Sequence, residues 1–174
     1  AEGVALHFMS MGYHAAVLRY SVASARYPVA LRQLAKAVAL LRKNSEKWHI
    51  QKDKIIVMGF SAGGHLAGSL GVFWNTPELA GEAGYTSEEI RPNGMILCYP
   101  VITSGEYAHE ESFRNLLGDR YEELKDNMSL EKQVTKDTPK AFIWHTFEDD
   151  TVLPDNTLLF VNALYKKGIP VEYH

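Results

Sequence analysis

The sequence predicts an α/β fold: a mostly parallel sheet with helices on both of its faces. Three short, continuous apolar runs carry this prediction. They span residues 55–58, 95–99 and 141–144 and have the length and composition of strands buried inside a parallel sheet. Residues 28–41 and 155–167 show apolar residues at helical spacing, and strands that alternate with such helices are typical of parallel sheets.

The N-terminal part of the chain contributes a helix, a strand and an amphipathic helix. Apolar residues before Gly12 predict a helix over residues 2–11 that ends at a glycine cap. Residues 15–18, with the sequence AAVL, are expected to form a buried strand. Pro28 suits the first turn of the amphipathic helix that follows. Its apolar face is made of Leu31, Leu34, Ala35, Val38 and Leu41.

The remaining segments complete a single domain over residues 1–174. A helix should follow the first apolar run over residues 62–73. Residues 103–137 have mixed polarity and are interpreted as a cap-like insertion between two strands. After the helix that Gly168 stops, residues 171–174 begin a last strand. No repeat, low-complexity tract or linker indicates a second domain.

The composition of the chain limits which kinds of molecule it is expected to bind. With 46% hydrophobic and 22% charged residues, the chain can bury the core of an ordinary soluble domain. A formal net charge of -3 provides no basic field, so nucleic acid and anionic membranes are poor partners. No apolar stretch is long enough for a membrane span. The only cysteine, Cys98, excludes an intrachain disulfide and favours a reducing compartment, the cytoplasm. A small neutral substrate is the expected partner.

Residues 59–63 spell GFSAG, a GxSxG pattern placed after a buried strand and before a helix. A sharp turn at such a junction leaves little room for side chains, so glycine is favoured on both sides of the serine. The turn would expose Ser61 as a nucleophile and aim the backbone N–H of Ala62 at a developing oxyanion. The alternative is a glycine-rich turn whose serine only caps the helix.

A serine nucleophile needs a base and an acid that orients the base, in the chain order serine, acid, histidine. Glu148, Asp149 and Asp150 follow the third apolar run, where their carboxylates would lie at the same sheet edge as Ser61. Asp149 is the preferred acid. The alternative is a solvated acidic turn that caps the helix beginning near Asp155.

The histidines do not provide an obvious base. Only His174 follows Asp149, and it belongs to a strand rather than to the loop beyond one. His65 is better explained as a packing or hydrogen-bonding residue of its helix, and His145 as a structural histidine that bonds the acidic loop. His109, in the insertion, is expected to be exposed.

Four segments carry a resemblance to a known superfamily. GFSAGGHLA at 59–67 and WHTFEDDTVLPDN at 144–156 look like the esterase/lipase branch of the α/β hydrolases. RYPVALRQLAKAV at 26–38 and SFRNLLGD at 112–119 narrow the resemblance to small acetyl-esterase and acetylxylan-esterase-like enzymes, which are related to dienelactone hydrolase. The resemblance covers nearly the whole chain.

The resemblance implies a nucleophile at Ser61, an oxyanion N–H at Ala62 and an acid at Asp149, three residues before the Val152 of a DxxV pattern. Asp150 is the fallback acid if the alignment slips by one residue. Members of this group also carry an oxyanion loop after an early strand and a histidine after the last strand. Neither segment is found in these 174 residues. No cofactor or metal is implied.

The resemblance implies hydrolysis of short acyl esters through an acyl-enzyme, with acetyl esters of plant-type oligosaccharides as the expected substrates. The insertion should shape the acyl or alcohol pocket, although Phe113, Leu116 and Leu117 suit simple packing equally well. Both ends look truncated, so we expect this chain alone to be nearly inactive and, through open strand edges, to self-associate as a homo-oligomer. A prolyl-oligopeptidase-type serine peptidase and a non-catalytic scaffold of the same fold are the alternatives.

Overall fold

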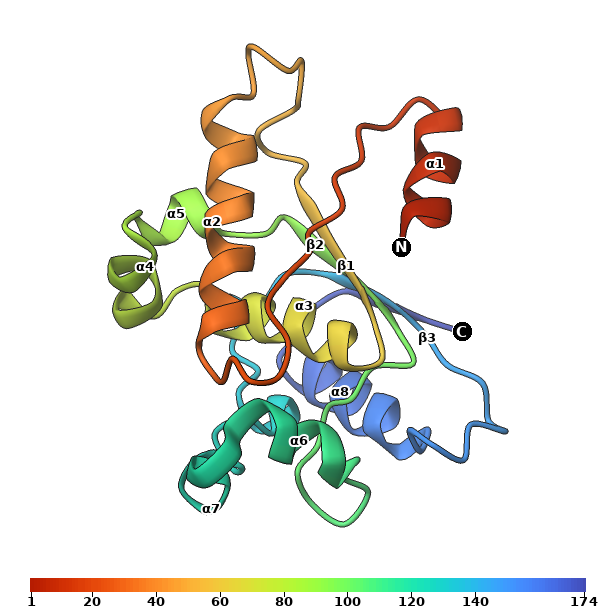
Figure 1. Cartoon of the computed structure of the whole chain (residues 1–174). Helices are drawn as coiled ribbons and strands as arrows, with labels where there is room; N and C mark the ends of the chain where they lie inside the picture. Colours follow the sequence, from red (N-terminus) through yellow and green to blue (C-terminus); the bar gives the residue numbers. More distant parts are fainter.

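A computed structural model describes all 174 residues and contains a four-stranded parallel sheet with helices packed against it (Figure 1). In chain order the elements are α1 (Glu2–Ser10), α2 (Val29–Lys43), β1 (Ile56–Phe60), α3 (Ala62–Phe73), α4 (Pro77–Ala83), α5 (Ser87–Ile90), β2 (Gly94–Cys98), α6 (Glu110–Leu117), the 3-10 turn η1 (Gly118–Arg120), α7 (Tyr121–Leu124), the 3-10 turn η2 (Leu130–Lys132), β3 (Ala141–Trp144), α8 (Asp155–Lys166) and β4 (Val171–Tyr173).

The sheet confirms the predicted α/β class. Its strands lie in the order β1-β2-β3-β4, and every neighbouring pair is parallel. The four strands correspond to the three apolar runs and the predicted last strand: the bounds of β3 agree with the prediction, and those of the other strands differ by one or two residues. Because parallel strands end at the same edge, the segments after β1 and β3 come to one side of the molecule.

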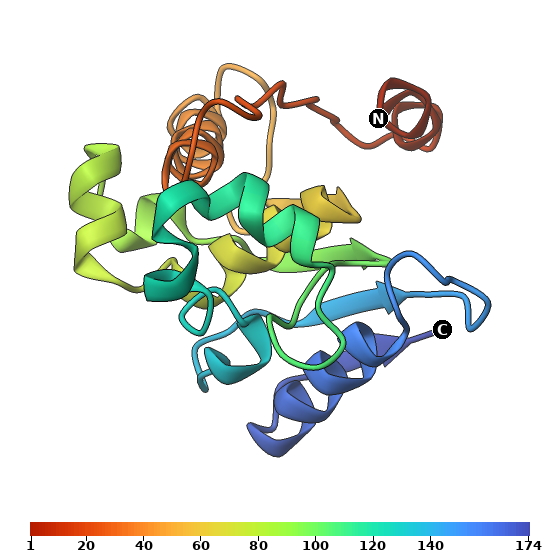
Figure 2. The ribbon, with the colours of Figure 1, turned by 60° about the horizontal axis from the view of Figure 1, so that its bottom comes forward.

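The helices that pack on the sheet cover one of its faces. Val57, Leu97 and Ile143 point to the same face and are buried, and they share a core with Leu70 of α3 and Phe160 of α8. On the opposite face Ile56, Phe142 and Trp144 are 36–44% exposed. Helix α1 has no buried residue and stands apart from the sheet in both views (Figures 1 and 2). The expected cover of both faces is therefore present on one face only in these residues.

The predicted strand at residues 15–18 is wrong. These residues form neither helix nor strand, and Ala15, Ala16 and Val17 are exposed. Since the sheet runs from β1 to β4 with β2 as the only neighbour of β1, no chain pairs with residues 15–18. An apolar run without a hydrogen-bonded neighbour cannot form a sheet ladder, whatever its propensity.

The insertion folds into short helices with a small core of its own, which we call the insertion core. Its members are Val101, Phe113, Leu117, Tyr121, Leu124, Met128 and Val152. Five of these seven come from the insertion, whereas Val101 lies just before it and Val152 lies in the loop before α8. The insertion is thus a packed unit that contacts the segments after β2 and β3. None of the helices combines the length and apolar character needed to cross a bilayer.

Candidate active site

Ser61 lies in a strained turn between β1 and α3. Its backbone has φ 51° and ψ -120°, a combination that non-glycine residues rarely adopt and that costs about 1–3 kcal/mol. Hydrogen bonds hold it on both sides: its N–H donates to the Cys98 carbonyl (3.1 Å), and its carbonyl accepts from the N–H groups of Val101 (3.2 Å) and His65 (3.1 Å). The turn is therefore fixed to the end of β2 as well as to its own helix.

Glycines are needed in this turn where backbone approaches backbone. A Cβ at Gly59 would lie 2.0 Å from the Gly63 carbonyl oxygen, and one at Gly64 would lie 2.8 Å from Cβ of Pro100. At Gly63 the nearest atom would be the Tyr20 hydroxyl at 3.5 Å, an ordinary contact. The expected steric reason for glycine is confirmed at Gly59, whereas it does not apply at Gly63.

Ala62 is the first residue of α3, so its N–H has no carbonyl one turn earlier to bind. The residue is exposed and lies at the positive end of the helix dipole. This N–H is free to donate to a negatively charged oxygen formed next to Ser61. The geometry is compatible with the oxyanion role that the sequence predicts.

The loop after β3 spans residues 145–153, and we call it the acid loop. One oxygen of Asp149, Oδ1, accepts hydrogen bonds from the N–H groups of Thr151 (3.0 Å) and Val152 (2.9 Å). The Asp149 side chain is 20% exposed, and its second oxygen, Oδ2, makes no hydrogen bond. Asp150 and Glu148 are exposed, and Asp150 accepts only a 3.4 Å bond from the Thr151 hydroxyl. Asp149 is the carboxylate with a fixed position and a free oxygen.

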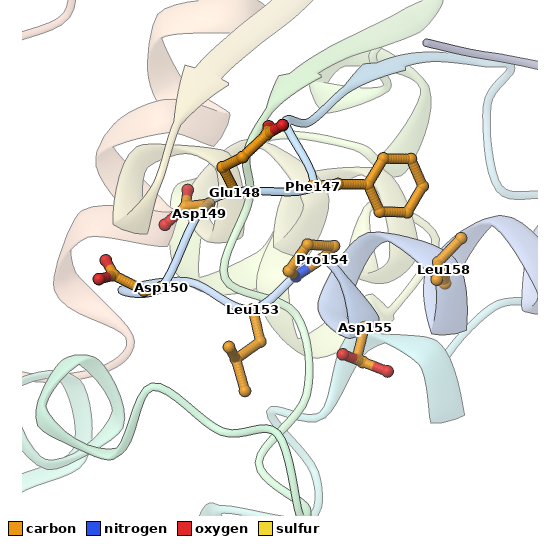
Figure 3. A pocket seen from close by; sticks show the side chains of 8 residues that line it. All are labelled: Phe147, Glu148, Asp149, Asp150, Leu153, Pro154, Asp155 and Leu158. Atoms are coloured by element: carbon orange, nitrogen blue, oxygen red, sulfur yellow. The ribbon is translucent and has the colours of Figure 1, made fainter.

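The capping alternative does not describe this carboxylate. Helix α8 has Pro154 as its N-cap and receives no side-chain capping bond. The Asp149 carboxylate instead closes a turn within its own loop. Together with the start of α8, the acid loop lines an open hollow of about 450 Å³ with both carboxylates and apolar side chains (Figure 3). Its lining residues are Phe147, Glu148, Asp149, Asp150, Leu153, Pro154, Asp155 and Leu158.

Ser61 and Asp149 follow strands β1 and β3, which are separated by β2. No hydrogen bond joins the two side chains, and no histidine side chain bonds Ser61. His174, at the end of β4, is exposed; it bonds Glu172 (2.9 Å) and stacks on Phe142. The chain brings the two predicted residues to the same sheet edge without a base between them.

His65 is buried in α3, as predicted for a packing or hydrogen-bonding histidine. Its Nε2 lies 2.9 Å from the Met128 carbonyl oxygen, and its Nδ1 lies 3.3 Å from the Ser69 hydroxyl. Burial lowers the pKa of His65 to about 4, although the bond to Met128 opposes this shift. With both ring nitrogens occupied, His65 is not available to Ser61.

His145 confirms the prediction of a structural histidine. Its Nδ1 lies 2.7 Å from the Thr157 hydroxyl, and its Nε2 lies 2.8 Å from the Val152 carbonyl oxygen. His109 differs from the prediction: it is half-buried, because its Nδ1 bonds the Ser112 hydroxyl (2.9 Å) at the start of α6. Cys98 is buried as expected, and burial raises the pKa of its thiol.

Comparison with known proteins identifies the family. Residues 1–164 match the profile of the family described as BD-FAE. The chain belongs to the BD-FAE family. Among curated proteins, this BD-FAE chain is 43% identical to endo-1,4-beta-xylanase B of Butyrivibrio fibrisolvens, over 99% of the chain and 28% of that protein. It is 27% identical to an acetylxylan esterase of Xylanibacter ruminicola, over 87% of the chain and 30% of that protein.

Among solved structures, an acetyl ester-xyloside bifunctional hydrolase from Caldicellulosiruptor lactoaceticus aligns with a TM-score of 0.88 and 38% identity. The alignment covers 100% of this chain and 64% of that one. MGS-M1, an α/β hydrolase enzyme from a deep-sea metagenome library, aligns with a TM-score of 0.73 and 34% identity over 100% of this chain and 59% of that one, which confirms the α/β-hydrolase class of the BD-FAE chain. The chain spans less than a third of the length of the two curated relatives and about two thirds of the Caldicellulosiruptor lactoaceticus hydrolase.

Proposed function

We propose that this BD-FAE chain forms the nucleophile and acid part of a serine carboxylic-ester hydrolase that removes short acyl groups from carbohydrate. The observation that carries the proposal is the strained backbone of Ser61 at a strand-to-helix turn. A serine that only capped the helix would need no such conformation, and backbone strain of this kind concentrates at functional sites. The exposed N–H of Ala62 beside it supplies an oxyanion donor.

In this mechanism the Ser61 hydroxyl attacks the ester carbonyl and passes its proton to a histidine base, which the family resemblance places after the last strand of the enzyme and not among the histidines described above. The Ala62 N–H stabilises the negative oxygen of the tetrahedral intermediate. The alcohol leaves with a proton from the same base, and water then hydrolyses the acyl-enzyme. Asp149 would orient the base through Oδ2, the oxygen that its own loop leaves unbonded.

The proposed substrate class rests on the activities after which the relatives are named. Two of them are an acetylxylan esterase and an acetyl ester-xyloside hydrolase, and the third is a xylanase. We therefore propose acetyl groups on xylan-type oligosaccharides as the natural substrate. A neutral ester suits a chain whose net charge is only -3.

The test is release of p-nitrophenol from p-nitrophenyl acetate by the complete gene product that contains residues 1–174. Turnover by the wild type and a loss of at least about 10³-fold in Ser61→Ala would support the proposal, because the nucleophile is indispensable to the acyl-enzyme route. Circular dichroism would establish that the variant is folded. A wild type without Ser61-dependent hydrolysis of any short ester would overturn it. Hydrolysis of a prolyl p-nitroanilide instead would support the peptidase alternative.

A further inference from the structure

Two buried histidines stand in matching positions beside the two candidate catalytic residues. His65 lies four residues after Ser61, and His145 lies four residues before Asp149. Their exposed fractions are 6% and 4%. Neither forms a hydrogen bond with a candidate catalytic side chain, although Nε2 of His145 lies 3.5 Å from Oδ2 of Asp149.

The hydrogen bonds fix the same tautomer in both rings. A carbonyl oxygen can only accept, so Nε2 must carry the hydrogen that binds Met128 in one case and Val152 in the other. Each Nδ1 then accepts from a hydroxyl on the neighbouring helix turn. These hydroxyls belong to Ser69 in α3 and Thr157 in α8. His65 thus links helix α3 to a carbonyl of the insertion, whereas His145, which itself belongs to the acid loop, links helix α8 to a carbonyl of that same loop.

The two residues that supply these carbonyls both belong to the insertion core. Met128 and Val152, which supply them, both bury their side chains in the insertion core at 2% exposure. Phe113 of the same core meets the His65 ring edge-on, with centroids 5.2 Å apart. The insertion core is therefore connected to the helix that follows Ser61 through His65, and to the acid loop through the side chain of Val152, whose backbone carbonyl His145 binds.

This connection matters because the sheet does not join the two residues directly. Strand β2 lies between β1 and β3, and no hydrogen bond joins Ser61 to Asp149. A second buried network supports the same loop: Asn156 accepts from the N–H groups of Ile102 and Thr103 and donates to the carbonyl of Leu153. The base of the insertion and the end of the acid loop are thereby held together.

We propose that His65 and His145 are paired positioning residues, which set the spacing of Ser61 and Asp149 by tying both to the insertion core. The inference rests on the proposed function, because it assigns those two residues their catalytic roles. On this view the insertion is a fixed frame for the catalytic residues rather than only a wall of the substrate pocket.

The first test is the tautomer of each ring in the complete gene product. Nitrogen-15 NMR of labelled histidine distinguishes a protonated from an unprotonated ring nitrogen. The proposal requires Nε2–H with an unprotonated, hydrogen-bonded Nδ1 for both His65 and His145 at neutral pH. Nδ1–H in either ring would overturn it, since the bond to Met128 or Val152 would then be impossible.

The second test compares glutamine and leucine at each position. The glutamine amide nitrogen can occupy the place of Nε2 and still donate to the carbonyl, whereas leucine cannot. With p-nitrophenyl acetate, we expect kcat per folded molecule to fall about 10- to 100-fold in His145→Leu and His65→Leu with little change in KM, because misplacement of catalytic groups acts on the chemical step. His145→Gln and His65→Gln should recover most of the loss.

The paired role predicts that the two losses do not multiply. Once one histidine is released from the insertion core, the spacing is already lost, so the double leucine variant should fall by clearly less than the product of the single effects. Multiplying losses, or glutamine variants no better than leucine, would overturn the inference while the proposed function stood. If the leucine variants do not fold, the glutamine variants and the tautomers still decide it. A wild type without Ser61-dependent turnover would instead overturn the proposed function, and this inference with it.

Discussion

The nucleophile turn and the acid loop lie at the same edge of the sheet, but different forces hold them in shape. The turn around Ser61 is fixed by backbone hydrogen bonds to Cys98 and Val101. It also needs glycine at position 59, because a side chain there would collide with the Gly63 backbone. The acid loop is fixed by side chains, chiefly His145 and Asp149, which bind its backbone from the inside.

The difference explains why the sequence predicts the candidate nucleophile, Ser61, more sharply than the candidate acid, Asp149. A backbone constraint requires particular residue types at fixed distances along the sequence from Ser61, and these appear as the GxSxG pattern. A side-chain network requires partners from distant parts of the chain, and neighbouring carboxylates such as Asp149 and Asp150 look alike in sequence. The network separates them, because only Asp149 closes the turn and keeps one oxygen free.

The largest expected effect tests that separation. In the complete gene product, Asp149→Asn should lower kcat for p-nitrophenyl acetate by about 10⁴-fold, as loss of a triad acid does elsewhere. The amide oxygen can still accept from Thr151 and Val152, so the loop should stay folded. Asp150→Asn is the matched control and should change kcat by less than about 10-fold. A larger loss of kcat in Asp150→Asn than in Asp149→Asn would show that Asp150 is the acid.

In the nucleophile turn, a side chain at Gly59 should destabilise the fold for steric reasons. Gly59→Ala places a methyl group 2.0 Å from the Gly63 carbonyl oxygen, and backbone cannot yield as a side chain can. We expect the free energy of unfolding in urea to fall by about 4 kcal/mol or more. Gly63→Ala meets only the Tyr20 hydroxyl at 3.5 Å and should stay within about 1 kcal/mol of wild type. Equal losses would show that the approach at Gly59 is not the constraint.

The fold followed from the sequence wherever an element could be identified from its own residues. The strand before Ser61, the helix at 62–73 and the helix after the acid loop all lie where periodicity and glycine stops predict them. The prediction of a strand at 15–18 was wrong because a strand forms only beside a neighbouring strand, and the local sequence does not show whether such a neighbour is present. The short helices α4 and α5 were not predicted, since four to seven residues carry little periodic signal.

The two histidines extend the same lesson to the site. Their burial and hydrogen bonding were predicted, but their partners were not. The Met128 carbonyl that His65 binds is 63 residues away in the chain, and a backbone carbonyl leaves no mark on the sequence. The insertion core was equally hidden, because its helices are short and one of its members, Val152, comes from the acid loop.

Burial of His65 predicts a pH dependence of stability. Its pKa is about 4 in the folded chain and about 6.5 in the unfolded chain, so the unfolded state binds a proton first as the pH falls. The stabilisation is complete above pH 6.5, falls between pH 6.5 and 4, and levels off below pH 4. The total loss is about 3 kcal/mol. Urea unfolding of wild type and His65→Gln across this range isolates the effect, because the variant should lack it; parallel curves would contradict it.

The smallest expected effect concerns the side-chain network of the acid loop. Thr157→Val keeps the shape of a fully buried residue but removes the hydroxyl that binds Nδ1 of His145. An unsatisfied buried acceptor costs about 1–3 kcal/mol, so we expect the free energy of unfolding to fall by about 1–2 kcal/mol.

Thr151→Val makes the same chemical change in the exposed part of the loop. Its hydroxyl makes only a 3.4 Å bond to Asp150, so stability should change by no more than about 0.5 kcal/mol. Urea unfolding of both variants measures the difference. If the acid loop depends on its buried side chains, Thr157→Val must be the more damaging change. Equal effects would mean that the bonds from the N–H groups of Thr151 and Val152 to the Asp149 side chain hold the acid loop without the buried bond between Thr157 and His145.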